Sequence, residues 1–168
     1  ADWLEHPAIV KQVVAGGKQR QDSVFNGYQA LPADTDIILV HDGVRPFLSK
    51  DMIQETINIA AEFGAAITAI PVNDTIKQVD NSGKVERTVD RESLWRVQTP
   101  QAFRYDLLGE AFRKAQKHSF YGTDEGALIE NLGQEVRVVT GSEWNLKITR
   151  PEDLVLGESI VAKLFPEA

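Results

Sequence analysis

A carboxylate and an arginine follow directly after an apolar run of strand length. Ile37 to Val40 places four large aliphatic residues in succession, and Asp42 and Arg45 come next. An unbroken aliphatic run is typical of a strand buried on both faces in a parallel sheet. Ligands bind beyond the carboxyl ends of such strands, where a carboxylate can hold a divalent cation and a guanidinium can bind a phosphate. The spacing predicts such a site, although a turn aspartate beside a surface arginine would give the same pattern.

More polar groups and glycines lie at the ends of other expected strands. They are Gly16, Gly17, Thr75, Thr99 and Lys147. Strand ends of one parallel sheet meet at one edge, so residues far apart in the chain can share a site. Cations and hydroxyls around a single carboxylate suit a phosphorylated substrate and a metal ion, for which catalysis consists largely of positioning and charge stabilisation.

These residues also have plain structural interpretations. Lys147 lies in an expected strand between two apolar residues, and most such lysines are simply solvated. Thr123 can be the N-cap of a helix, and Arg20 and Ser23 can merely begin one. Spacing alone therefore leaves their roles open.

Strand-like and helical segments alternate through most of the chain. Apolar residues at helical spacing, together with capping residues, predict helices over about 21–31, 49–63, 105–117, 123–132 and 151–164. Apolar strands are expected over 12–14, 37–40, 65–71, 136–139 and 146–148. Strands separated by helices imply crossover units, so we expect an α/β fold whose mostly parallel sheet carries helices on both faces.

Residues 75–91 break this pattern. Two segments with period-two alternation, 75–79 and 85–89, flank the turn-rich residues 80–83, which is typical of a β-hairpin. The polar alternation indicates an arm that protrudes from the main sheet. Because a two-stranded hairpin is only marginally stable alone, this arm needs a partner surface.

The composition limits the classes of function. The 168 residues suit one domain, with 42% hydrophobic and 26% charged residues and a net charge of −7. An acidic chain without a basic run is a poor match for nucleic acid, so an anionic ligand must be held by locally placed lysines and arginines. The sequence has no cysteine, no apolar run of membrane-spanning length and no visible signal peptide. We expect a cytoplasmic protein that binds neither nucleic acid nor membrane.

Several short motifs follow one another in an order that resembles one enzyme family. They span residues 15–24 (AGGKQRQDSV), 40–46 (VHDGVRP), 71–77 (PVNDTIK), 89–91 (VDR), 98–103 (QTPQAF), 123–125 (TDE) and 145–149 (NLKIT). Each motif is weak alone. Together, from about Val13 to the last expected helix, they resemble the 2-C-methyl-D-erythritol 4-phosphate cytidylyltransferases of non-mevalonate isoprenoid biosynthesis.

The resemblance implies a Rossmann-like nucleotidyltransferase that transfers CMP from CTP to 2-C-methyl-D-erythritol 4-phosphate, releases pyrophosphate and uses Mg²⁺. It assigns Asp42 to the metal and substrate, Lys147 to the α-phosphate, and Gly17 and Ser23 to the cytosine end of CTP. The residues implied to hold the sugar phosphate are Arg45, Thr75, Arg91, Thr99, Thr123 and Lys147. The catalytic residues are then Lys147, Asp42 and Arg91.

In this family the hairpin arm enters a second subunit. The resemblance therefore implies a homodimer in which residues 75–91 form the dimerisation arm. Thr75 and Arg91 would then serve the site of the neighbouring subunit, which supplies the partner surface that the arm needs.

One departure from the family is large. The family begins with a strand and a glycine-rich loop whose arginine and lysine hold the triphosphate, and nothing before Gly16 matches them. We therefore expect residues 1–168 to be a single nucleotidyltransferase domain that is incomplete at its N-terminus. Two alternatives stay open. One is a ribitol 5-phosphate cytidylyltransferase, which residues 89–95 and 122–125 resemble less, and the other is a non-catalytic dimerisation or binding module.

Overall fold

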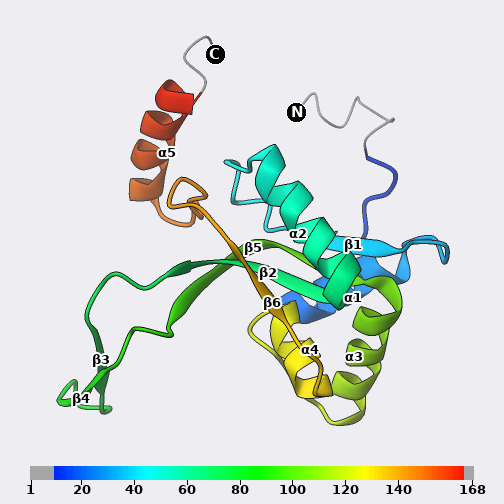
Figure 1. The fold of residues 1–168 in the computed structure, drawn as a ribbon, viewed down its shortest axis with the longest axis horizontal. Helices are drawn as coiled ribbons and strands as arrows, with labels where there is room; N and C mark the ends of the chain where they lie inside the picture. Colours follow the sequence, from blue (N-terminus) through cyan, green and yellow to red (C-terminus); the bar gives the residue numbers. More distant parts are fainter. Residues whose placement is uncertain (1–9, 165–168) are drawn as a thin grey trace.

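The computed structural model describes residues 10–164, which form a central sheet covered by helices and a separate hairpin (Figure 1). The elements in chain order are α1 (Arg20–Gln29), β1 (Ile37–Val40), α2 (Lys50–Phe63), β2 (Ala65–Pro71), β3 (Ile76–Val79), β4 (Val85–Val89), β5 (Trp95–Arg104), α3 (Tyr105–Lys117), α4 (Glu125–Leu132), β6 (Arg137–Thr140) and α5 (Pro151–Leu164). Within these residues, no helix combines the length and the apolar character needed to cross a membrane.

Four strands form the central sheet in the order β1-β5-β2-β6. β2 and β6 pair in parallel, whereas β5 runs antiparallel to both β1 and β2. Three strands therefore share one direction, as expected for a mostly parallel sheet, and β5 makes the sheet mixed. The reversal has a simple cause: β2 leads out of the sheet into the arm, and β5 returns from the arm beside it.

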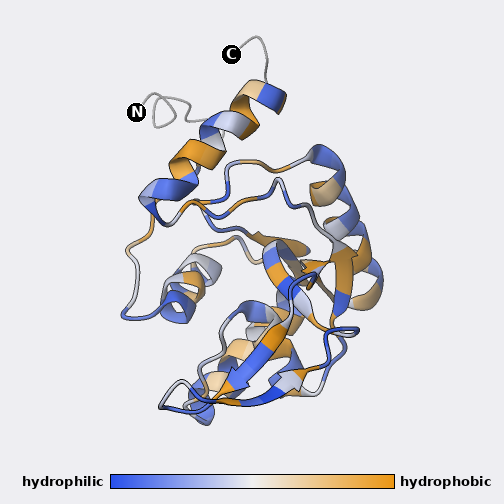
Figure 2. Ribbon diagram, turned by 90° about the vertical axis from the view of Figure 1, so that its left-hand side faces the viewer, coloured by the Kyte–Doolittle hydropathy of each residue, from blue (hydrophilic) through white to orange (hydrophobic). Residues whose placement is uncertain are grey.

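The sheet buries one layer of side chains on each face. Ile67 and Phe103 pack against α3 and α4 on one face, with α1 contributing at the edge of the same layer. Ala66 and Ala102 pack with Ala60 of α2 on the other face. These neighbouring residues alternate in direction because successive side chains of a strand point to opposite faces. The strands of the central sheet are mainly hydrophobic (Figure 2), and the expected placement of helices on both faces is confirmed.

Helices α2 and α4 have well-defined ends. The Ser49 hydroxyl accepts the Met52 N–H at the start of α2, and Gly64 follows the helix with φ 99°, a conformation that favours glycine. The N-cap of α4 is Asp124, whose side chain accepts the Ala127 N–H, and not Thr123. Both residue types cap helices, and Thr123 stands one position outside, so its hydroxyl is left for another role.

Replacing Asp124 by alanine is expected to lower the free energy of unfolding by about 2 kcal/mol, as measured by urea titration. The Asp124 carboxylate caps α4 and also accepts Gln101 Nε2 at 2.8 Å, so alanine removes the acceptor of two hydrogen bonds. Asp124→Asn keeps an oxygen for the Ala127 N–H and should lose less. Equal losses in both variants would show that the cap contributes nothing.

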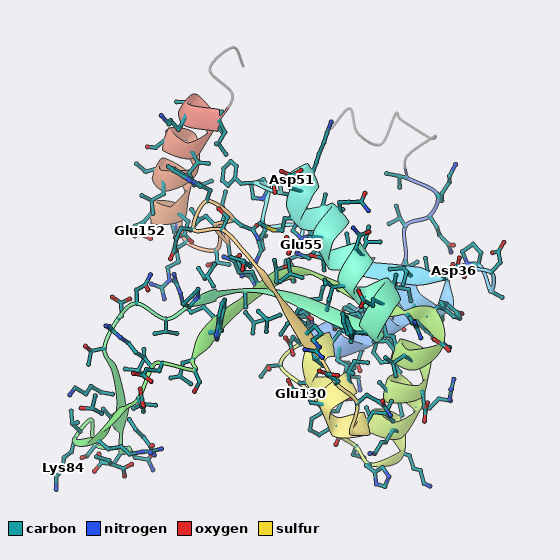
Figure 3. All side chains as sticks on the ribbon, in the orientation of Figure 1. Asp36, Asp51, Glu55, Lys84, Glu130 and Glu152 are labelled. Atoms are coloured by element: carbon teal, nitrogen blue, oxygen red, sulfur yellow. The ribbon has the colours of Figure 1, made fainter. Side chains whose placement is uncertain are left out.

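The arm consists of β3 and β4, which form their own two-stranded sheet. Its turn is held by Asp80, whose Oδ1 accepts the backbone N–H groups of Ser82 and Lys84 at 2.8 and 3.0 Å. Lys84 lies at the far tip, away from the body of the protein (Figure 3). Val79 and Val85 are each 52% exposed, so the arm is well formed but leaves apolar side chains uncovered in this chain.

Candidate active site

Asp42 follows β1 directly and its backbone is fixed by β5. The Asp42 N–H donates to Thr99 Oγ1 at 3.0 Å, and Thr99 Oγ1 lies 2.9 Å from His41 Nδ1. His41 Nε2 is 2.8 Å from the Arg45 carbonyl, which can only accept. The imidazole therefore carries its proton on Nε2, and Nδ1 accepts from Thr99. This chain of hydrogen bonds holds the whole loop from His41 to Arg45 against the sheet.

Two cations contact the Asp42 carboxylate from distant parts of the chain. Lys147 Nζ donates to Oδ2 at 3.0 Å, and Arg20 lies 3.3 Å from Oδ1 through Nη2. Burial alone would raise the pKa of Asp42, but the hydrogen bond from Lys147 and the charge of Arg20 outweigh it and hold the pKa below its ordinary value. Asp42 is therefore a carboxylate held ionised between two positive groups.

Arg45 contributes a third positive group with unused hydrogen-bonding capacity. Its Nη1 donates to the Asn145 carbonyl at 2.7 Å, while its Nε is buried and has no partner among the described residues. Burial lowers the pKa of Arg45, and nearby Asp42 only partly offsets this. A buried guanidinium N–H without an acceptor is costly. Because Arg45 also lines the cleft described below, its positive charge favours an anionic ligand there.

Asn145 forms hydrogen bonds to several segments around Asp42 and Arg45. It is fully buried, and its Nδ2 donates to the Thr99 carbonyl at 2.8 Å and to Gln98 Oε1 at 3.3 Å. With its own carbonyl bound to Arg45, it ties the loop before α5 to β5 and to the loop after β1. Because Asn145 is fixed in this way, Lys147, two residues further on, is positioned to contact the Asp42 carboxylate.

These groups surround an open cleft of about 400 Å³. It is lined by Arg20, Asp42, Arg45, Ile67, Val97, Gln98, Thr99, Gln101, Thr123, Asp124, Ala127, Glu130 and Lys147. Glu130 marks the α4 side of the cleft in Figure 3. The lining brings basic and hydroxyl side chains together with three carboxylates, of which Asp42 is the one that contacts both Arg20 and Lys147.

The structure gathers five of the predicted site residues in this cleft: Asp42, Arg45, Thr99, Thr123 and Lys147. Lys147 reaches it from a loop, because residues 146–148 form no strand, contrary to expectation. The segment makes one backbone bond to its neighbour, from Ile148 N–H to the Val44 carbonyl at 2.8 Å, which is too little pairing for a strand. The strand expected over residues 12–14 is also absent.

Gly17 and Ser23 lie outside the cleft lining, at the start of α1. The Gly17 N–H donates to Ser23 Oγ at 3.0 Å, and Ser23 Oγ donates to the Gln19 carbonyl at 3.1 Å. A side chain at Gly17 would collide with Asp22, so this tight turn requires glycine. The two residues form one local unit, and their binding of a cytosine stays a prediction.

Thr75 and Arg91 also lie outside the cleft lining of their own chain. Both are exposed at the base of the arm, and Arg91 Nη1 donates to the Asn73 carbonyl. This placement agrees with a role in another subunit's site, which stays a prediction because a single chain is described.

The sequence analysis missed the ion pair that supports Asp42. Arg20 Nη1 lies 2.8 Å from both carboxylate oxygens of Glu125, a side chain that is only 1% exposed. Both residues belong to motifs that carry the family resemblance, which was the available signal. Glu125 in the first turn of a helix looks like an ordinary dipole-compensating residue, so its burial could not be seen from spacing.

Comparison with known proteins agrees with the geometry of the cleft. A sequence model of the 2-C-methyl-D-erythritol 4-phosphate cytidylyltransferases matches residues 2–163. The enzyme of that name from Pelotomaculum thermopropionicum is 50% identical over 152 residues, which cover 90% of this chain and 64% of the relative. The one from Syntrophus aciditrophicus is 45% identical over 165 residues, 96% of this chain and 70% of the relative.

Solved structures of enzymes with this activity in their names also resemble the chain. The 4-diphosphocytidyl-2C-methyl-D-erythritol synthase from Anaerococcus prevotii superposes with a TM-score of 0.83 at 33% identity, covering 95% of this chain and 74% of that chain. The cytidylyltransferase from Thermus thermophilus gives 0.80 at 37% identity, with 88% and 71% covered. The chain spans about 64% of the length of the first relative described above. It belongs to the 2-C-methyl-D-erythritol 4-phosphate cytidylyltransferase family.

Proposed function

We propose that the protein transfers CMP from CTP to 2-C-methyl-D-erythritol 4-phosphate and releases pyrophosphate. The observation that carries this proposal is the Asp42 carboxylate held between Lys147 and Arg20, next to the buried and unpartnered Nε of Arg45. A carboxylate oriented between two cations suits phosphoryl chemistry better than hydrolysis by a nucleophilic side chain.

In the proposed reaction, a phosphate oxygen of the sugar phosphate attacks the α-phosphorus of CTP. A new P–O bond forms, the bond to the bridging oxygen of the β-phosphate breaks, and pyrophosphate leaves with that electron pair. Lys147 donates hydrogen bonds to the α-phosphate and stabilises the negative charge that builds there. Arg45, Thr99 and Thr123 bind and orient the sugar phosphate, so that the attacking oxygen is in line with the leaving group.

The residues present fit a divalent cation, most simply Mg²⁺. The described residues contain no cluster of three or more His, Asp or Glu side chains that could hold a metal unaided. Mg²⁺ commonly binds through one or two carboxylates plus substrate phosphates, and Asp42 is a suitable single carboxylate. When bound, Mg²⁺ would neutralise charge on the triphosphate, and Asp42 would hold it.

Replacing Asp42 by asparagine is expected to lower turnover roughly tenfold or more and to raise the magnesium concentration that gives the half-maximal rate. The variant keeps the shape of the side chain but loses the charge that a cation requires. Initial rates measured across a MgCl₂ series check this. An unchanged magnesium dependence would show that Asp42 is no metal ligand.

The activity itself is tested by incubating the full-length protein with CTP, MgCl₂ and either 2-C-methyl-D-erythritol 4-phosphate or ribitol 5-phosphate, and by measuring pyrophosphate release. The proposal expects release with the methylerythritol phosphate. Release with ribitol 5-phosphate but not with 2-C-methyl-D-erythritol 4-phosphate would favour the alternative, a ribitol 5-phosphate cytidylyltransferase. No release with either, under conditions in which a family relative is active, would favour a binding module.

We also propose that the protein acts as a homodimer joined by the arm, residues 75–91. The support comes from the uncovered Val79 and Val85 and from the position of Thr75 and Arg91 outside their own chain's cleft. A partner subunit would cover the apolar side chains and bring both polar residues to a second cleft.

A further inference from the structure

The ion pair between Arg20 and Glu125 is built more tightly than the contact between Arg20 and Asp42. Nη1 of Arg20 lies 2.8 Å from both Glu125 oxygens, whereas Nε and Nη2 lie 3.4 and 3.3 Å from Asp42 Oδ1. The guanidinium thus binds two carboxylates through different nitrogens. Its position is set by Glu125, and Asp42 is the looser partner.

Burying the Glu125 carboxylate costs free energy. Its side chain is 1% exposed, and burial raises its pKa although the charge of Arg20 opposes this. Burial would lower the pKa of Arg20, but Glu125 and then Asp42 outweigh it and raise the pKa. A carboxylate that only compensated the dipole of a helix would be more stable in water than in the interior. The burial of the pair therefore indicates a further role.

We propose that Arg20 is a positioning residue: Glu125 anchors its guanidinium from α4 so that the opposite edge fixes Oδ1 of Asp42, while Oδ2 faces Lys147. The inference rests on the proposed cytidylyl transfer, in which Asp42 must be correctly oriented. A planar guanidinium can join two carboxylates in a fixed geometry, which the single ammonium of a lysine cannot do.

Two variants separate positioning from simple stability. Arg20→Met leaves Glu125 buried without a partner and should lower Tm by roughly 6 °C or more. Arg20→Met combined with Glu125→Leu removes both charges and should regain most of that Tm, because apolar pairs of similar volume replace buried ion pairs well. The double variant should nevertheless turn over roughly tenfold to a hundredfold more slowly, with a KM for CTP close to that of the wild type.

Arg96 and Glu143 provide a matched control. They form an ion pair of the same residue types at 2.8 Å, but their side chains are 55% and 62% exposed and lie outside the cleft lining. Arg96→Met combined with Glu143→Leu should leave turnover and KM unchanged. Surface pairs of this kind contribute little.

Several outcomes would overturn the proposal. A double variant with regained Tm and wild-type turnover would reduce the pair to a structural one, and a raised KM with unchanged turnover would make Arg20 a ligand-binding residue. If the double variant does not fold, Arg20→Lys decides, since it keeps the charge beside Glu125 but should still turn over slowly; wild-type turnover there rejects the proposal. A wild-type protein without cytidylyl transfer would instead reject the proposed function, independently of Arg20.

Discussion

Replacing Lys147 by alanine is expected to lower turnover about a hundredfold or more, the largest single effect in the cleft. The ammonium lies 3.0 Å from Asp42 Oδ2, and the Lys147 side chain is 43% exposed, so the group is held by one contact and can face a ligand. A donor placed where charge builds in the transition state is worth about 3 kcal/mol. Pyrophosphate release by the Lys147→Ala protein under saturating CTP measures this loss.

Two comparisons sharpen that test. Lys117 at the end of α3 is an exposed lysine outside the cleft lining, and Lys117→Ala should keep wild-type turnover. The Lys147→Ala protein should also keep its Tm, because an exposed ion pair contributes little to stability. Near-normal turnover in a folded Lys147→Ala protein would exclude the proposed role at the α-phosphate.

Replacing Arg91 by alanine is expected to reduce activity roughly tenfold to a hundredfold, the value of one charge-assisted phosphate contact. This loss should occur in the neighbouring subunit's site. Mixing Arg91→Ala chains with Lys147→Ala chains therefore gives mixed dimers in which one site carries both changes and the other carries neither. Activity in the mixture should therefore rise to the level expected from the fraction of sites that carry neither change.

The mixing experiment needs proof that subunits exchange, which differently tagged chains and a pull-down supply. Recovery of activity after exchange supports arms that cross between subunits. Exchange without recovery would place Arg91 in the site of its own chain. A monomer at assay concentration would remove the dimer proposal altogether.

The sequence predicted the part of the site that depends on local order. Asp42 and Arg45 follow an aliphatic strand, and the position of such a strand in a sheet determines where the next residues lie. The family resemblance then added Thr99, Thr123 and Lys147, which spacing alone left open. All five line the cleft.

The sequence did not predict the features that depend on burial or on tertiary pairing. Arg20 and Glu125 are separated by 105 positions, and neither residue type indicates which partner it will find. The capping of α4 was assigned one residue early because Thr123 and Asp124 are both good N-caps. The sequence analysis gave residues 95–104 no direction in the sheet, because alternation and hydrophobicity are the same for a strand read in either sense.

The continuity of the arm with the centre of the sheet has a consequence for insertions and deletions. β2 leaves the sheet and β5 re-enters it side by side, with the Val72 N–H donating to the Leu94 carbonyl at 2.9 Å. Adding or removing residues in the turn at 80–84 changes only the length of the arm, because the site lies at the other end. Removing one residue between Trp95 and Thr99 would instead slide the start of β5 by one register position against β2 and turn the Thr99 hydroxyl toward α2. Homologous chains can therefore vary in length at the hairpin tip, whereas the spacing from Trp95 to Thr99 is fixed by the pairing of β5 with β2.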